Sequence, residues 1–296
     1  MANLKFDGDY EDATANAVNG TPVGSPTFEP GKLGQAVHIH TDVYHGTNNY
    51  VRLGLPDVLK FGTNDFSFSF WVKVLQQKKD QPFIGNMDWW NETGGGLVVA
   101  SAGSPANGFK MKMYDALGNV AATTAVPLGT LGEWRHCVAT FKRDGMATLY
   151  VDGVSATTTD ISSARGSVDV LANSWNIGQD GTGVFYNGPY DAELNALMDD
   201  VGIWRKALTS AEVTEIYTNG LAGISLPAPA KLKITRLGNQ VVLSWPSTAS
   251  GFALQKTTSL SPLSWSAVTD PVVVVGDQNT VTVSLTGGES YYRLKK

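Results

Sequence analysis

Short runs of alternating apolar and polar residues recur through this 296-residue chain and limit what it can fold into. Residues 66–74 read Phe-Ser-Phe-Ser-Phe-Trp-Val-Lys-Val, and residues 109–114 read Phe-Lys-Met-Lys-Met-Tyr. A period of two places successive side chains on opposite faces of a strand. Turn residues such as Asp152 and Gly153 separate the runs, which is typical of antiparallel sheets with one buried face. We therefore predict an all-β chain.

One segment has a convincing helical period. Thr209 is followed three residues later by Glu212, the spacing of a capping box in which each residue accepts a backbone N–H of the other. Gly220 follows as a typical helix stop. We predict a single short helix between these residues.

The composition of the chain changes near residue 222. Residues 1–230 carry 15 basic and 24 acidic side chains, whereas residues 231–296 carry 7 and 3. An Ala- and Pro-rich segment between the two parts favours extended backbone. We predict a large domain over residues 1–222, a linker over 223–230 and a small β-sandwich over 231–296, where seven short strand-like runs follow at close spacing.

Several classes of protein are disfavoured by composition. The net charge of −5 gives no general electrostatic reason to bind nucleic acid. No run of 18 apolar residues occurs, so we expect no membrane span. The first residues lack the apolar core of a secretion signal, so the chain is either made without one or begins where one was removed. The one cysteine, Cys137, cannot form an internal disulfide and is expected to be a small buried residue.

Seven blocks of the large domain, in order, resemble laminin-G-like domains of the concanavalin A-like lectin/glucanase superfamily. The blocks are residues 4–8, 31–37, 50–53, 66–72, 132–139, 149–153 and 198–217. The resemblance implies a two-sheet antiparallel jelly-roll sandwich. The C-terminal part resembles a fibronectin type III-like module, with Val-Leu-Ser-Trp at 242–245 and Tyr-Tyr-Arg-Leu at 291–294. Such modules often end exported bacterial proteins, which implies an extracellular or cell-surface location.

The resemblance also implies a structural calcium ion where the first strand meets the last. Asp7 and the pair Asp199 and Asp200 occupy the matching positions. Calcium binds six to eight hard oxygen atoms, which carboxylates and backbone carbonyls can supply. Alternatively, Asp7 and Asp200 cap turns by accepting backbone N–H bonds.

Two aromatic loops are candidate sugar-binding surfaces. Their candidate ligand-binding residues are Asp88, Trp89, Trp90 and Glu92 in the first loop and Phe185, Tyr186, Asn187 and Tyr190 in the second. Adjacent strand residues point to opposite faces, so at most one tryptophan of the pair fits a core. The apolar face of a pyranose stacks on aromatic rings while its hydroxyls meet Asn, Asp and Glu side chains. Alternatively, these aromatic residues hold the loops onto the sandwich.

Two histidines on one strand offer a further candidate site. His38 and His40 lie two residues apart and share one face, with His45 nearby. Three imidazoles in this arrangement could bind a transition metal. The alternative is a polar strand that faces solvent.

These observations favour a non-catalytic, lectin-like protein that recognises a polysaccharide through loop aromatics and holds a structural calcium. Two alternatives stay open: a structural or adhesive protein of a cell surface or virion, and a glycan-cleaving hydrolase or lyase of jelly-roll type. Retaining glucanases need paired carboxylates, commonly as Glu-x-Asp-x-x-Glu on one strand, and this run is absent. Catalysis is therefore the less favoured alternative. A protein partner is a further expectation for the C-terminal module.

Overall fold

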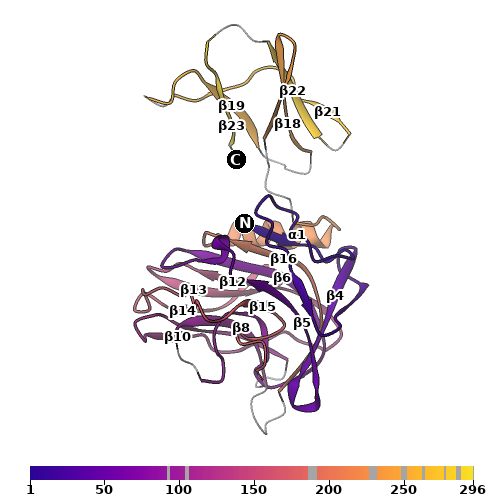
Figure 1. Ribbon diagram of the computed structural model, residues 1–296, viewed down its shortest axis with the longest axis vertical. Helices are drawn as coiled ribbons and strands as arrows, with labels where there is room; N and C mark the ends of the chain where they lie inside the picture. Colours follow the sequence, from indigo (N-terminus) through magenta and orange to yellow (C-terminus); the bar gives the residue numbers. More distant parts are fainter. Residues whose placement is uncertain are drawn as a thin grey trace. The chain divides into compact units, whose positions relative to one another are not determined.

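The chain forms two compact units, Met1–Leu226 and Pro227–Lys296, in a computed structural model (Figure 1). The structure describes residues 1–91, 94–103, 107–185, 192–226, 232–247, 252–261, 264–276, 278–284 and 288–295. Within these ranges the chain is almost entirely β, as predicted. No described helix is both long enough and apolar enough to cross a bilayer.

The first unit is a jelly-roll sandwich. Its strands follow the order β10-β9-β8-β7-β15-β5-β4-β16-β6-β12-β13-β14, with β1, β2, β3 and β11 paired beside this path. All of these pairs are antiparallel. The elements are β1 Ala2–Leu4, β2 Thr21–Val23, β3 Thr27–Pro30, β4 Gln35–Asp42, η1 Val43–His45, β5 Thr47–Gly54, η2 Asp57–Leu59, β6 Phe66–Lys78, β7 Pro82–Gly85, β8 Gly96–Ala102, β9 Gly108–Tyr114, β10 Val120–Ala122, β11 Val126–Pro127, β12 Trp134–Phe141, β13 Met146–Val151, β14 Val154–Asp160, β15 Trp175–Ile177, β16 Glu193–Trp204 and α1 Ser210–Leu221.

The alternation in β6 builds the centre of the core. Phe66, Phe68 and Phe70 are fully buried in one large cluster that both layers of the sandwich supply. Phe66 stacks on Phe141 of the neighbouring strand β12, with ring centroids 4.4 Å apart, and Phe70 lies 5.5 Å from Phe83 of β7. Burying such large rings is the main favourable term for the fold.

Helix α1 covers part of the outer face of the sheet that contains β12 and β13. Val213 of the helix is buried against Val138 and Tyr150. The predicted capping box between Thr209 and Glu212 is confirmed. Contrary to our expectation, the helix does not stop at Gly220 but continues to Leu221. A Cβ atom on Gly220 would lie 2.6 Å from the Trp71 indole, so close packing on the sheet requires glycine there.

Adjacent residues on β12 serve opposite faces of its sheet. Cys137 is fully buried in the main core, as predicted for a small buried residue. His136 faces the outer side, where its Nε2 lies 2.8 Å from Ser69 Oγ and its ring packs near Trp71 and Tyr217. The two side chains therefore do not form a pair.

The second unit contains two small sheets around its own core. The sheets have the orders β17-β18-β22-β21 and β20-β19-β23, and Leu243, Trp245, Leu254 and Val281 form the buried centre. Each of the seven predicted strand-like runs overlaps one observed strand, whereas the fibronectin type III-like assignment stays a prediction. The strands are β17 Lys233–Leu237, β18 Gln240–Pro246, β19 Ala253–Thr257, β20 Ser266–Ala267, β21 Val273–Val275, β22 Gln278–Ser284 and β23 Tyr291–Lys295.

Candidate functional site

The two aromatic loops of the first unit pack against each other. Trp89 and Phe185 are 8% and 4% exposed, with ring centroids 6.4 Å apart, and they share a small apolar cluster with Met87 and Ala192. Trp90 is 55% exposed. The adjacent tryptophans therefore differ in role: Trp89 holds the loops together, and Trp90 is largely exposed.

Polar contacts fix the first loop beneath Trp90. The backbone N–H of Trp89 donates to Asp180 Oδ2 at 3.0 Å, and its indole Nε1 donates to the carbonyl of Asp80 at 2.9 Å. Lys110 completes the anchor, because its ammonium pairs with Asp80 at 2.9 Å and lies 5.4 Å from the Trp89 ring centroid. Burial raises the pKa of Asp180, although N–H and O–H donors oppose the shift. A preorganised loop loses little conformational entropy when it binds a ligand.

Of the other predicted ligand-binding residues, the structure describes Asp88. Asp88 accepts hydrogen bonds from the backbone N–H of Asn91 at 3.0 Å and from its Nδ2 at 2.8 Å, so its carboxylate stabilises its own turn. Asp88 and Trp90 thus belong to one compact turn. Four further predicted residues lie outside the described ranges: Glu92, Tyr186, Asn187 and Tyr190.

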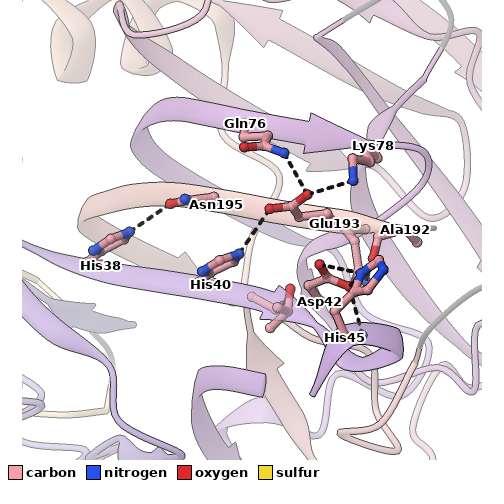
Figure 2. Close-up of polar contacts among 12 residues, drawn as sticks. His38, His40, Asp42, His45, Gln76, Lys78, Ala192, Glu193 and Asn195 are labelled. Atoms are coloured by element: carbon pink, nitrogen blue, oxygen red, sulfur yellow. Dashed lines mark hydrogen bonds and ion pairs between the residues drawn. The ribbon is translucent and has the colours of Figure 1, made fainter. Parts of the chain in front are cut away.

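A row of hydrogen-bonded polar side chains runs across β4, β16 and β6 (Figure 2). Glu193 is the centre of the row: its Oε1 lies 3.0 Å from His40 Nε2, and its Oε2 accepts from Gln76 Nε2 at 2.8 Å. The Lys78 ammonium is 3.3 Å from the same carboxylate. Three neighbouring polar groups hold this nearly buried carboxylate in place. Sugar hydroxyls bind to side chains of this kind.

The remaining histidines of this region are also engaged by neighbours. His38 Nε2 is 2.7 Å from Asn195 Oδ1, and His38 Nδ1 is 2.7 Å from Glu29. His45 Nδ1 is 2.8 Å from Asp42. In the described ranges no three His, Cys, Asp or Glu side chains are grouped to hold a metal ion. The contacts of His38, His40 and His45 with neighbouring side chains are those expected for the polar-strand alternative.

The polar row and the aromatic loops are linked through the start of β16. Ala192 belongs to the cluster of Trp89 and Phe185, and it precedes Glu193 directly. Gln81 Nε2 donates to the Ala192 carbonyl at 3.0 Å, which ties the chain after β6 to the same point. The buried aromatic cluster and the polar row are therefore joined at the start of β16.

Two of the three aspartates predicted to bind calcium, Asp7 and Asp199, accept hydrogen bonds from the turn that contains Gly31 and Gly34. The third, Asp200, accepts one from Leu226 at the end of the first unit. Asp199 Oδ2 accepts from the backbone N–H of Leu33 at 2.7 Å, and Asp7 Oδ1 accepts from that of Gln35 at 2.9 Å. A Cβ atom on Gly31 would lie 2.6 Å from Asp199 Oδ2, so the carboxylate approaches the turn as closely as glycine allows. These contacts match the turn-capping alternative.

Two carboxylate oxygens of this region have no hydrogen-bond partner among the residues that the structure describes. Asp200 Oδ2 accepts from Leu226 N–H at 2.7 Å, but its Oδ1 and the Oδ1 of Asp199 are buried without a partner. Burial, assisted by the neighbouring carboxylates, raises the pKa of Asp199 to about 8 and that of Asp200 to about 6. The region therefore combines buried acids that are costly to ionise with oxygens that can accept a cation.

Part of the polar row was missed in the sequence. Glu193 stands out there as an acidic residue after an aromatic loop, but Gln76, Lys78 and Asn195 do not. Their signal in the sequence is weak, because it consists only of alternate polar residues at the end of β6 and the start of β16. Their proximity depends on strand pairing, which places Glu193 opposite Lys78 and Asn195 opposite Gln76.

Residues 45–214 match the Laminin_G_3 family, described as the concanavalin A-like lectin/glucanases superfamily. The match covers more than half of the chain, which therefore belongs to this family. The predicted resemblance of the large domain is confirmed. No curated protein sequence gives a match.

Solved structures with the same fold include toxin binding domains. The chain is similar to the binding domain of Paraclostridial Mosquitocidal Protein 1 (TM-score 0.56, 16% identity, 81% of this chain and 63% of that chain). It is also similar to the botulinum neurotoxin serotype G binding domain (0.57, 12%, 83% and 61%), so it spans less than two thirds of either protein chain. A third is the botulinum neurotoxin serotype D ligand binding domain in complex with N-acetylneuraminic acid (0.53, 12%, 98% and 79%). At these identities the likeness concerns the fold.

Proposed function

We propose that the first unit is a non-catalytic carbohydrate-binding domain whose polysaccharide stacks on Trp90. The observation that carries the proposal is the opposite placement of the two tryptophans: Trp89 is locked into the loop cluster, and this rigid support presents Trp90 at 55% exposure. The C–H face of a neutral sugar ring fits an exposed indole. The connected row around Glu193 supplies acceptors and donors for hydroxyls.

The fold comparison supports the same proposal. The serotype D toxin domain, which shares this fold at 12% identity, is recorded in complex with N-acetylneuraminic acid. The sugar identity in our proposal rests on the surface around Trp90, which favours a neutral polysaccharide because indole stacking needs an apolar sugar face.

Replacing Trp90 by alanine should weaken binding to a neutral polysaccharide about tenfold, or ~1.4 kcal/mol, because the stacking surface is lost. Affinity gel electrophoresis of the full chain in a panel of neutral polysaccharides measures the effect. Trp90→Phe keeps a ring at the same position and should retain most of the retardation. If no neutral polysaccharide retards the parent chain, or if Trp90→Ala migrates like the parent in the one that does, the loop surface is not the site.

We also propose that a calcium ion binds beside Asp199 and Asp200, with Asp7 nearby. The support is the pair of buried Oδ1 atoms without a hydrogen-bond partner. Calcium accepts backbone carbonyl and water oxygens as well as carboxylates, so it does not need three grouped acidic side chains. The ion would neutralise carboxylates that burial otherwise keeps from ionising.

Adding calcium at about 100 times its Kd should stabilise the folded chain by about 3 kcal/mol, because a ligand of the folded state alone shifts the unfolding equilibrium. Thermal unfolding with calcium and with a chelator checks this. Asp199→Asn should abolish the calcium response, whereas Asp88→Asn, a change in an exposed turn, should keep it. Identical melting curves in calcium and chelator would leave the aspartates as turn caps alone.

The extracellular or cell-surface location and a protein partner for the second unit are further parts of this proposal. Both follow from the resemblance of the C-terminal residues to exported modules. Secretion into the medium by the native host, followed by immunoblotting of cell fractions, would test the location.

A further inference from the structure

Five basic side chains gather around one cavity of about 530 Å³ in the first unit. They come from the ends of neighbouring strands: Lys142 and Arg143 follow β12, and Arg205 and Lys206 follow β16. Strand β6 lies between these two strands and begins at the same end, since Phe66 pairs with Phe141 and Ser67 with Trp204. The fifth basic residue is Arg165, and Asp65 and Asp144 are the acidic residues of the lining. We call these seven residues the basic cleft.

The basic cleft lies far from the candidate carbohydrate site. Glu193 of that site pairs with Lys78, the last residue of β6, whereas the cleft surrounds the start of β6 at Phe66. A strand of 13 residues spans roughly 40 Å. The cleft is therefore a separate feature.

The arginines of the cleft are held by carbonyl oxygens rather than by carboxylates. Arg143 is 4% exposed, and its Nη2 donates to the carbonyls of Ala164 at 2.6 Å and Gly166 at 2.7 Å. Arg205 Nη1 donates to the Lys60 carbonyl at 2.7 Å. Carbonyl acceptors orient a guanidinium but leave its full charge in place. None of the three arginines forms an ion pair within the described ranges.

Two of the cations are already matched by acids. Lys142 pairs with Asp65 at 3.0 Å and with Asp144 at 2.9 Å, and Lys206 pairs with Glu212, which lies on α1. The excess positive charge of the cleft therefore comes from the three arginines. This excess stands out because the unit as a whole carries 24 acidic and 15 basic side chains.

We infer that the basic cleft binds an oxyanion, the sulfate or carboxylate group of an acidic polysaccharide. The exposed Arg165 and Arg205 present guanidinium N–H donors that match the oxygens of such groups, whereas the buried Arg143 contributes charge alone. A nucleic acid would need an extended basic path, because its affinity comes from neutralising many phosphates. The cleft is confined and the rest of the unit is acidic, which favours a single bound anionic group on a sugar chain. The inference does not depend on the Trp90 surface.

Dextran sulfate and dextran test the inference, because the two polymers share a backbone and differ in sulfate. The full chain should bind dextran sulfate in isothermal titration calorimetry, with affinity that falls as salt rises. The exposed pair Lys142→Gln/Arg165→Gln should lower this affinity about tenfold and flatten its salt dependence, since fewer counterions are exchanged. Asp144→Asn removes a negative charge from the cleft and should strengthen binding, a gain that a folding defect cannot produce.

The matched control is Lys32→Gln/Lys73→Gln, which removes two positive charges from the same unit outside the cleft. This variant should bind dextran sulfate within twofold of the parent, and Trp90→Ala should bind dextran sulfate chains shorter than the roughly 40 Å between the two surfaces like the parent. The inference is overturned if the cleft pair binds like the parent or if the control loses as much affinity. An oligonucleotide that binds the cleft as tightly as dextran sulfate, or a cleft that responds only to inorganic sulfate, would overturn the polysaccharide assignment.

Discussion

Trp89→Ala will lower the free energy of unfolding of the first unit by about 3–5 kcal/mol, the range for removing a large buried aromatic side chain. The loss combines the apolar cluster with Phe185 and the two hydrogen bonds that Trp89 makes to Asp80 and Asp180. Urea denaturation of the full chain, followed by far-ultraviolet circular dichroism, measures the effect. Binding to polysaccharide should also be lost, because the support of Trp90 collapses.

The neighbouring residue gives the matched control. Trp90→Ala removes an exposed ring of the same size and should change the free energy of unfolding by less than about 1 kcal/mol. The two variants therefore separate support from contact: one loses stability and binding, the other loses binding alone. Equal destabilisation by both would show that the two rings do not divide their roles in this way.

His136 should make the protein less stable as the pH falls below its ordinary pKa. Burial lowers the pKa of His136 to about 3, from an ordinary value of 6.5. Between these values the unfolded chain binds a proton that the folded chain does not, so stability is present above pH 6.5 and is lost as the pH decreases. Well below pH 6.5 the slope is about 1.4 kcal/mol per pH unit, and the loss between pH 6.5 and 4.5 is roughly 2 kcal/mol because the unfolded imidazole is only half protonated at pH 6.5.

His136→Gln isolates this effect, because glutamine does not titrate. The free energy of unfolding of the parent, minus that of the variant, should fall by roughly 2 kcal/mol from pH 6.5 to 4.5. The difference is needed because Asp199 and Asp200 act in the opposite sense: their raised pKa values make metal-free protein less stable as the pH rises. Parallel pH profiles for parent and variant would mean that His136 is protonated in the folded state.

The architecture could be predicted from the local sequence pattern, because the features that decide it either join residues close together in the chain or repeat with a strict period. Alternation in residues 66–74 identified β6 and its buried phenylalanines. The Thr209 capping box identified the start of α1. The helix end was wrong by a residue because Gly220 serves a contact with Trp71, which lies far away in the chain and cannot be seen from local propensity.

The candidate site could be predicted only in part, for the same reason. Adjacency alone showed that Trp89 and Trp90 cannot both be buried, but not which of them would be. That choice depends on Asp180, which accepts the Trp89 N–H from 91 residues away. The basic cleft is assembled in the same way from strand ends that only the sheet brings together.

The length of β6 has a consequence for how a long ligand would bind. The strand pairs with β16 from Ser67 to Lys78 and with β12 from Phe66 to Lys73, and this pairing holds its two ends roughly 40 Å apart. A saccharide chain that reaches from the Trp90 surface to the basic cleft would gain avidity, because its second contact forms within one complex. A shorter chain would engage one end only. The fixed separation of the two surfaces therefore makes binding strength depend on polymer length as well as on composition.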